Sequence, residues 1–410
     1  MKILHISPMY YPALGGAEVH LKEVSEGLAA RGHDVTVLTS NVQNTWDLWP
    51  AQDGALPDTE VINGVKVIRV RPDAGRLAAG FRVLSELPGG HRTLRLLFTL
   101  DGVHLLARGP RAFGMLPHIL RARADIVASM NWYWPPAVYA YLARRLKRFR
   151  LVGIPLFHTA EEWCNREIYK RMLVQCEAII ANTQYEGEFA AQRGARRVEV
   201  GGVGIHPEAF DGRNGALIRL RYGLGDRPVV GFVGRATPNK GIGPVVESMR
   251  QVWAWNPEVR LVLAGPTPGK TSPLESLLAT LTEAERERVV RIHDFAEQDK
   301  ASIYDAFDVF VLPSTGESFG LGYLEAWMCR KPVVGARIGP TACIIDEGEN
   351  GLLANPEDPA DLARGIIDLL ADRSKRERMG QRGYDKTLAQ YTWGRVTDKV
   401  ERLYHDLLTT

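Results

Sequence analysis

The chain has 410 residues, of which 45% are hydrophobic and 24% are charged, and its formal net charge is +3. At roughly 100–200 residues per domain, this composition predicts a globular protein with two domains. Residues 1–205 contain 25 Lys and Arg against 19 Asp and Glu, and the remainder contains 26 against 29. This imbalance is too weak to indicate binding to nucleic acid, and no nucleic-acid motif accompanies it.

The sequence contains no pattern typical of secretion or of membrane insertion. The opening residues MKILHIS form too short an apolar run for the core of a signal peptide. The longest later apolar stretch, RLLFTLDGVHLLA, is interrupted by Asp101 and His104 and is too short to cross a bilayer. The cysteines lie far apart, without the paired spacing of a zinc site or a disulfide framework; they are Cys164, Cys176, Cys329 and Cys343. We therefore expect a reduced, cytoplasmic protein.

Short β-branched runs alternate with helical patterns in two successive series. In the first, strands are expected at KILHIS, DVTVLT, VKVIRV, DIVAS, RLVGIPLF and EAIIAN, with helices over 16–31 and 136–147. After the glycine-rich passage GGVGIHPEAFDGRNG, a second series contains PVVGFVG, VRLVLAG, VVRIHDF, DVFVLPS and KPVVGA. Continuous apolar runs bounded by glycine are typical of parallel strands that are buried on both faces.

Two series with one break predict an α/β protein with two doubly wound, Rossmann-like domains facing each other across a cleft. We expect the first domain over residues 1–205 and the second over 206–392, with a last helix over 393–410 that packs back on the first domain. Ligands in such folds bind beyond the carboxyl ends of the strands. The residues that follow each strand are therefore the candidates for function.

A glycine pair follows the first strand. Gly15 and Gly16 precede a helix with Glu18 in its first turn. Glycine lets a ligand approach the backbone closely, and free N–H groups at a helix start attract phosphate. A tight turn would explain the same two glycines. The pattern is not G-x-G-x-x-G, which disfavours a dinucleotide cofactor.

Two cations follow the first strand of the second series. The loop GRATPNKGI contains Arg235 and Lys240, which could bind a diphosphate and stabilise its charge as it leaves. Two solvated loop cations are the alternative. The spacing is not that of a Walker loop, and no D-x-D sequence occurs in the chain. We therefore expect neither ATP hydrolysis nor a metal ion on the diphosphate.

A third candidate segment, STGESFGLGYLEAWMCRKPVV, contains two glutamates. Glu317 lies in the loop and Glu325 eight positions later, followed by the apolar residues AWMC. Phe319, Gly320 and Leu321 are expected to begin a helix with unpaired N–H groups that suit a phosphate. The carboxylates could accept hydrogen bonds from hydroxyls of the ribose and of the sugar in a nucleotide sugar. Alternatively, Glu317 caps the helix and Glu325 is solvated.

These segments together resemble glycosyltransferase family four, whose members have the GT-B fold and transfer sugars with retention. The resemblance rests on GRATPNKG, on PSTGESFGLGYLEAWMCRKPVV with its two glutamates, and on GGAE, PLFHTAEEW, IIANTQYEGE and GVGIHPEAF in the same order. It extends over nearly the whole chain.

The resemblance implies a role for each candidate residue. Arg235 and Lys240 would bind the diphosphate of the donor, Glu325 its ribose and Glu317 the transferred sugar. His158, in FHTAEEW, matches the active-site histidine of the family, near the reacting carbon of the sugar. The phosphates would contact backbone N–H groups around Phe319, Gly320 and Leu321 and the Gly15–Gly16 loop, and the base would lie near AGPTPGK and Phe295.

The resemblance also implies the partners. The donor would be a UDP-sugar or GDP-sugar, and the acceptor hydroxyl would belong to a saccharide, a lipid-linked molecule or a small molecule; no further cofactor, metal or nucleic acid is expected. The sequence departs from the family where Gly339 is followed by proline and Cys343 replaces a glutamate, so the donor does not follow by analogy. An epimerase or phosphorylase of the same fold, or a silent nucleotide-sugar-binding subunit, is the competing interpretation.

The acceptor side is least like the family over residues 74–120. Arginines are frequent over 69–123 and 144–150, which predicts contact with an anionic membrane at the inner face of the plasma membrane. Ordinary solvated arginines are the alternative. Trp132, Tyr133 and Trp134 could form a sugar-stacking wall or belong to the core.

Overall fold

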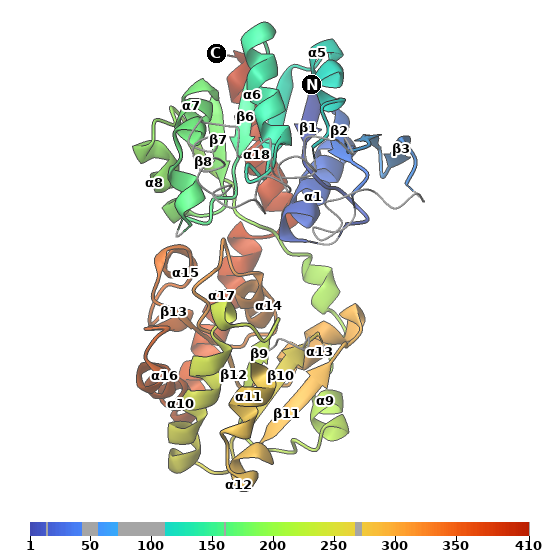
Figure 1. Ribbon diagram of the computed structural model, residues 1–410. Coiled ribbons are helices and arrows are strands. Elements are labelled where there is room, and N and C mark those ends of the chain that lie inside the picture. The colour runs from blue at the N-terminus through green and yellow to red at the C-terminus, as the bar shows by residue number, and fades with distance from the viewer. Residues whose placement is uncertain (14, 43–55, 73–110, 160, 267–272, 410) are drawn as a thin grey trace, which may run out of the picture. The chain divides into compact units, whose positions relative to one another are not determined.

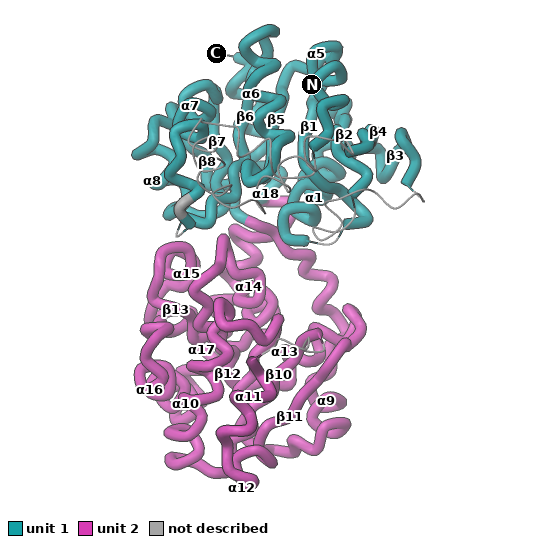
Figure 2. The backbone as a smooth tube through the Cα atoms, in the orientation of Figure 1, with its two compact units in different colours: residues 1–202, 396–410 teal, residues 203–395 magenta. Residues whose placement is uncertain are grey.

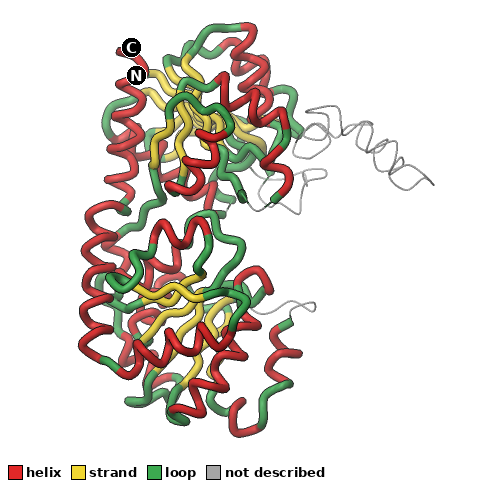
Figure 3. Tube along the Cα trace, turned by 90° about the vertical axis from the view of Figure 1, so that its left-hand side faces the viewer, coloured by secondary structure: helices red, strands yellow, loops and turns green. Residues whose placement is uncertain are grey.

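The computed structural model describes residues 1–13, 15–42, 56–72, 111–159, 161–266 and 273–409. It divides the chain into two compact units (Figure 2): unit 1 contains residues 1–202 and 396–410, and unit 2 contains residues 203–395. In each unit, helices lie on both sides of a single sheet (Figure 3).

Within the described residues, unit 1 contains an eight-stranded sheet with the order β3-β4-β2-β1-β5-β6-β7-β8 (Figure 1). Its strands are β1 (Lys2–Ile6), β2 (Asp34–Ser40), β3 (Thr59–Ile62), β4 (Val65–Val70), β5 (Ile126–Met130), β6 (Arg150–Ile154), β7 (Ala178–Ala181) and β8 (Val198–Val200). Its helices include α1 (Gly16–Ala30), α5 (Met115–Arg121), α6 (Pro136–Leu146), α7 (Glu167–Gln175), α8 (Gln184–Gln192) and the 3-10 helix η1 (Glu162–Asn165). Every residue of β5 and β7 is buried, as expected of parallel strands that are covered on both faces.

In the described part of unit 2, six strands form a parallel sheet with the order β11-β10-β9-β12-β13-β14. These are β9 (Val229–Val233), β10 (Arg260–Gly265), β11 (Val289–His293), β12 (Val309–Leu312), β13 (Val333–Ala336) and β14 (Gly351–Ala354). The helices include α9 (Gly215–Arg221), α10 (Ile242–Trp255), α11 (Leu274–Ala279), α12 (Glu283–Arg286), α13 (Lys300–Asp305), α14 (Leu321–Met328), α15 (Gly339–Ile344), α16 (Pro359–Ala371) and α17 (Arg373–Gln390).

Three strands are absent from the sequence prediction: β3, β8 and β14. Each lies at an edge of its sheet, and none is buried along its whole length. An edge strand is covered less completely than a central one, so its sequence lacks the continuous apolar run by which the other strands are recognised.

The last helix, α18 (Trp393–Thr409), begins in unit 2, and its residues from 396 onward belong to unit 1. Its buried side chains recur with the period of an amphipathic helix; they are Val396, Val400, Leu403, Tyr404 and Leu407. Tyr404 Oη forms a 3.1 Å hydrogen bond with His5 Nε2, and burial lowers the pKa of His5 to about 3. At the surface, Arg31 donates to the Glu401 carboxylate at 2.6 Å. Polar contacts thus join α18 to β1 and to the residue that follows α1.

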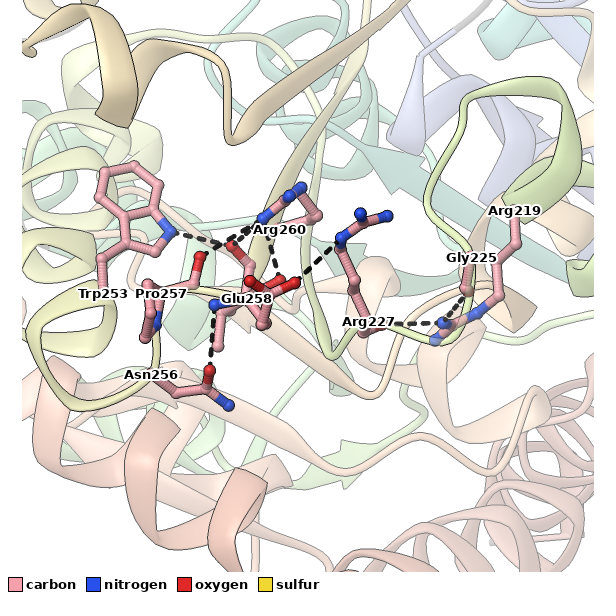
Figure 4. Close-up of polar contacts among 9 residues, drawn as sticks. Arg219, Gly225, Arg227, Trp253, Asn256, Pro257, Glu258 and Arg260 are labelled. Carbon is pink, nitrogen blue, oxygen red and sulfur yellow. Dashed lines mark hydrogen bonds and ion pairs between the residues drawn. The ribbon is translucent and has the colours of Figure 1, made fainter.

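Polar contacts at the amino-terminal edge of the unit 2 sheet hold the turn that leads into β10 (Figure 4). Trp253 Nε1 donates to Val259 O at 3.0 Å, and Glu258 N donates to the Asn256 side chain at 3.0 Å. The Glu258 carboxylate pairs with Arg227 Nε at 3.2 Å. These contacts fix the sheet at the edge opposite to the carboxyl ends, where ligands bind in such folds.

Helix α17 packs against α14 through a glycine surface. A Cβ atom on Gly380 would lie 1.9 Å from Arg330 O, and one on Gly383 would lie 2.1 Å from Cδ1 of Trp327. Trp327 is fully buried, and its Nε1 donates to Asn350 O at 2.9 Å. Only glycine therefore lets α17 approach the helix that carries Glu325 this closely.

We expect Gly383→Ala to destabilise unit 2, because the new methyl group would overlap the buried indole ring of Trp327. Overpacking of this kind costs about 1–3 kcal/mol. The matched control is Gly365→Ala in α16, where the nearest atom would be Val334 Cγ1 at 3.4 Å. This control should stabilise the protein by about 0.4–1 kcal/mol, since alanine restricts the unfolded chain. Urea unfolding followed by tryptophan fluorescence measures both, and an unchanged midpoint for Gly383→Ala would contradict the close packing.

Candidate active site

The loops that follow β9 and β12 meet at the carboxyl edge of the unit 2 sheet. Strand β9 pairs with β10 on one side and with β12 on the other. The chain runs outward from β9 through β10 and β11 before it returns to β12, so its direction across the sheet reverses between β9 and β12. In doubly wound sheets, such a reversal marks the position of the ligand site.

Backbone contacts join these two loops. Thr315 N and Ser314 Oγ both donate to Asn239 O, at 3.0 and 2.8 Å. Gly241 has φ = 76°, and a Cβ atom on it would lie 2.4 Å from Pro313 O. Both its left-handed conformation and this close approach require glycine.

An ion pair links two of the predicted site residues. Lys240 Nζ donates to Glu317 Oε1, and the two side chains are 21% and 11% exposed. The structure thus brings the proposed diphosphate cation and the proposed sugar carboxylate into contact. The alternative in which Glu317 caps the helix is wrong, because the N-cap of α14 is Gly320, without a side-chain cap.

Glu325 is held by two side chains from α13. Tyr304 Oη donates to Glu325 Oε2 at 2.7 Å, and Lys300 Nζ lies 2.8 Å from Oε1. The Glu325 side chain is 16% exposed, so the alternative of a solvated residue is wrong. Burial lowers the pKa of Lys300, but Glu325 and Glu297 outweigh this effect and leave it raised. Burial, reinforced by Glu325, raises the pKa of Tyr304 well above its usual value. A protonated amine and a neutral hydroxyl therefore orient the carboxylate.

Sequence reasoning missed Lys300 and Tyr304. They lie four residues apart, a spacing that places them on one face of a helix. The spacing is visible in the sequence, but nothing in it connects this face to a glutamate 21 residues beyond Tyr304.

The start of α14 has the expected form. Gly320 has φ = 101° and is followed by Leu321, the first residue of the helix. Phe319 is 3% exposed, and its ring packs edge-on against Tyr391, 5.4 Å away between centroids. Tyr323 N donates to Gly320 O at 3.0 Å, whereas the N–H groups of Leu321 and Gly322 have no carbonyl partner within their own helix, which leaves donors beside the glutamates.

The remaining predicted donor residues lie on neighbouring loops of unit 2. The Arg235 side chain is exposed, and no ion pair joins it to another described residue. Phe295 is half-buried and follows Asp294, whose N–H donates to Gly265 O at 3.1 Å. A narrow depression lies at the carboxyl ends of β9, β10 and β11; among the residues that line it are Phe232, Gly234, Leu263, Gly265, Pro266 and His293. Of the segment AGPTPGK, residues 267–270 lie outside the described residues.

In unit 1, the Gly15–Gly16 pair begins α1, with Gly15 as the N-cap. A Cβ atom on Gly15 would lie 2.2 Å from Oε2 of Glu18. Glu18 is 5% exposed, and burial raises its pKa. A phosphate at this helix start would therefore have to displace or replace the Glu18 carboxylate.

His158 follows β6 at the carboxyl edge of the unit 1 sheet, with an exposed side chain. Its carbonyl accepts hydrogen bonds from Glu161 N at 2.7 Å and from Cys164 Sγ at 3.2 Å. The preceding residue, Phe157, is 2% exposed. The main chain of His158 is thus fixed while its imidazole remains accessible.

The aromatic run after β5 is divided between the core and the surface. Trp132 is fully buried and packs against Phe157 and Tyr169, so it belongs to the core and cannot stack on a sugar. Tyr133 and Trp134 are half-buried.

The predicted basic surface is only partly described, because residues 73–110 lie outside the described residues. Two of its arginines, Arg69 and Arg111, are buried, and that prediction is wrong for them. Arg69 pairs with Glu60 and donates to Tyr11 O at 2.8 Å. Among the described helices, none has both the length and the apolar character needed to span a membrane. All four cysteines are free.

Comparison with known families accounts for both units. The family described as Glycosyl transferases group 1 matches residues 218–386, and the one described as Glycosyl transferase 4-like domain matches residues 15–204. These ranges include His158, Glu317 and Glu325. The chain belongs to the group 1 glycosyltransferases of family four.

Two relatives are similar over most of their length. A D-inositol 3-phosphate glycosyltransferase of Stackebrandtia nassauensis is 28% identical, over 100% of this chain and 91% of its own. One of Xylanimonas cellulosilytica is 29% identical, over 92% of this chain and 89% of its own. The chain is therefore a glycosyltransferase with a nucleotide-sugar donor.

Solved structures confirm the GT-B fold. Sucrose-phosphate synthase of Thermosynechococcus elongatus has a TM-score of 0.74 and 23% identity, covering 100% of this chain and 99% of that one. Anabaena HepE in complex with UDP and glucose has a TM-score of 0.69 and 20% identity, covering 98% of this chain and 99% of that one.

We expect Lys300 and Glu325 to be coupled, because both are mostly buried and removing either one leaves the other with one partner fewer. In a double-mutant cycle with Lys300→Met and Glu325→Gln, measured by urea unfolding, the coupling should be about 0.5–3 kcal/mol. The control pair, Arg373 and Glu377 on α17, is 83% and 64% exposed. That pair should give only about 0.3–0.5 kcal/mol. Equal couplings would show that the Glu325 pair is no stronger than a surface contact.

Proposed function

We propose that this protein is a retaining hexosyltransferase that moves a sugar from a UDP-sugar or GDP-sugar to an acceptor hydroxyl without a metal ion. The observation that carries the proposal is the pair of lysine–glutamate contacts beside the start of α14. Glu317 with Lys240, and Glu325 with Lys300, place carboxylates, cations and free N–H groups at one sheet edge.

The donor diphosphate would bind Arg235, Lys240 and the N–H groups around Phe319, Gly320 and Leu321. The exposed guanidinium of Arg235 suits this role. Lys240 already forms an ion pair with Glu317, so a bound diphosphate would compete with that carboxylate for the amine. Two cations and a helix start together would stabilise the charge that the diphosphate gains as it leaves.

The two glutamates would bind hydroxyls. A carboxylate offers about four acceptor positions, and Tyr304 and Lys300 each occupy one at Glu325. The free positions would accept hydrogen bonds from the ribose hydroxyls. Because α13 already fixes Glu325, little side-chain freedom would be lost on binding. Glu317 would contact the transferred sugar, and Phe295 and its main chain would lie beside the base.

Retention would follow from attack on the same face that the diphosphate leaves. The acceptor oxygen forms its bond to the anomeric carbon as the carbon–phosphate oxygen bond breaks. The acceptor's proton passes to a phosphate oxygen of the departing nucleotide, so no side chain acts as a base. We assign His158 to orienting the sugar and stabilising positive charge at the anomeric carbon.

For the acceptor, we propose a small phosphorylated polyol. The relatives that align over more than nine-tenths of this chain are named for D-inositol 3-phosphate, which supports a small acceptor more than a lipid-linked one or a polysaccharide. Cys343, exposed on α15, stands where the family commonly has a glutamate, so the sugar is left to experiment.

The experiment is a matrix of donors and acceptors. UDP-glucose, UDP-N-acetylglucosamine and GDP-mannose are incubated with inositol phosphate, with a polyprenyl-phosphate sugar and with buffer alone. Nucleotide release and product mass are measured, and the anomeric configuration of the product is read by NMR. Transfer with retained configuration in EDTA supports the proposal. Inverted product, activity that needs added magnesium, or conversion of the donor sugar to its epimer would each refute part of it.

Glu325→Ala should weaken donor binding, because charge-assisted hydrogen bonds to the ribose are lost. A loss of about 1.5–3 kcal/mol corresponds to roughly 10- to 150-fold in Kd. Calorimetry with the nucleotide sugar measures the change. The control is Glu297→Ala. Glu297 is the other carboxylate that pairs with Lys300, and its side chain is 83% exposed. Equal affinities for the two variants would rule out the ribose role.

His158→Ala should lower kcat by about 10²–10³-fold, the usual effect of losing one contact that acts in the transition state. The Kd of the free nucleotide should not change, since Arg235, Lys240 and Glu325, the side chains proposed to bind it, lie in unit 2. His118→Ala, at an exposed histidine of α5, is the control. A near-normal kcat would show that the imidazole takes no part in the reaction.

A further inference from the structure

The backbone that leads to His158 passes through an unfavourable conformation. Leu156, two residues beyond the end of β6, has φ = 56°. Non-glycine residues seldom adopt this left-handed region, and they keep it only where the surrounding structure holds them. Phe157 follows, buried among the rings of Trp132, Trp163 and Tyr169. The loop is therefore held in place, and the contact that holds its peptide groups can be identified.

That contact is made by Glu186, the third residue of α8. Phe157 N donates to its Oε1 at 2.8 Å, and Asn182 N donates to its Oε2 at 2.8 Å. One carboxylate thus joins the loop after β6 to the connection between β7 and α8. The backbone N–H of Glu186 donates to Thr183 Oγ1 at 3.2 Å, and this side chain caps α8.

The Glu186 carboxylate is 2% exposed, and no ion pair links it to a lysine or arginine in the described chain. Burial raises its pKa to about 7, while N–H groups of Asn182, Phe157 and Leu156 favour the ionised form. Burying a carboxylate is costly unless hydrogen bonds compensate. Here the compensating donors are the backbone N–H groups of Asn182 and of Phe157, the residue just before His158.

We infer that Glu186 is a positioning residue for His158. It fixes the peptide group that joins Leu156 to Phe157, and so the direction in which the His158 imidazole leaves the main chain. The inference rests on the proposed role of His158 in the reaction. It adds that the geometry of this histidine is set by a carboxylate 28 residues away in the sequence, on helix α8.

The chemistry of the carboxylate suggests the variant. A glutamine at this position has one acceptor oxygen, and its NH₂ group would face one of the two N–H donors that the carboxylate now accepts. Glu186→Gln therefore keeps the size of the side chain and loses one of the two bonds. A displacement of about 1 Å near a reacting centre can reduce the rate 10²-fold. We expect a fall in kcat of about 10- to 100-fold for Glu186→Gln.

Thr183→Ala is the matched control. It removes the cap of the same helix turn but leaves both bonds of the Glu186 carboxylate in place. Both variants should lower Tm. Only Glu186→Gln should lower kcat, with the Kd of the free nucleotide unchanged, and only Glu186→Gln should speed hydrogen exchange at the Phe157 amide. Glu186→Asp, which keeps the charge on a shorter side chain, should have an intermediate kcat.

The outcomes separate this inference from the function on which it rests. If His158→Ala loses activity while Glu186→Gln keeps the kcat of Thr183→Ala, the positioning role is refuted and the proposed function stands. If His158→Ala retains activity, the role of the histidine fails, and the positioning role with it. Loss of nucleotide affinity in Glu186→Gln would show a general structural role instead. If Glu186→Gln does not fold, Glu186→Asp replaces it, and a kcat equal to that of Thr183→Ala refutes the inference.

Discussion

The pairing of β12 with β9 determines where the candidate site of unit 2 lies. The strands are parallel, with Val309 beside Val230 and Phe310 beside Gly231, so their carboxyl ends emerge together. Gly231 allows this arrangement at the centre of the sheet, because a Cβ atom there would lie 2.2 Å from the ring of Phe307. The loops that follow then meet through Asn239 and Ser314. Two segments more than 70 residues apart in the chain form one site for this reason.

Electrostatics within that site depends on pairing. Each of the two glutamates has one lysine, and all four side chains are less than a quarter exposed. Charges that are partly removed from water interact more strongly than surface charges. The two pairs nevertheless differ. Lys300 and Tyr304 hold Glu325 from a neighbouring helix, while Lys240 ends a short 3-10 helix (Pro238–Lys240) and Glu317 lies in a loop. The first arrangement suits a fixed binding group, and the second suits residues that exchange partners when an anion binds.

Unit 1 shows a different use of a buried carboxylate. Glu186 has no cation beside it in the described residues and instead accepts hydrogen bonds from the backbone of two loops. Helix α18 also contacts the sheet of this unit, because its Tyr404 forms a hydrogen bond with His5 on the first strand. Both contacts join segments from distant parts of the chain, and both are shielded from water. The exposed imidazole of His158 therefore emerges from a rigid support.

Most of the fold and part of the site could be predicted from the sequence. Continuous apolar runs identify the central strands, because a parallel strand covered on both faces needs apolar residues on both. The spacing of Glu317 and Glu325, with glycines between them, identifies a loop followed by a helix start. The partners of these residues could not be predicted. A local sequence pattern indicates side-chain contacts only between residues up to about four positions apart along a helix. Lys300 contacts Glu325, and Glu186 contacts Phe157, only after the strands have paired. For Trp132 the sequence left two interpretations, a sugar-stacking residue or a core residue, and the packing of Phe157 and Tyr169 against it decides for the core. The sequence by itself determined which elements form and which residues follow them; the tertiary structure decided which side chains meet, because those contacts depend on the order of the strands in the sheet.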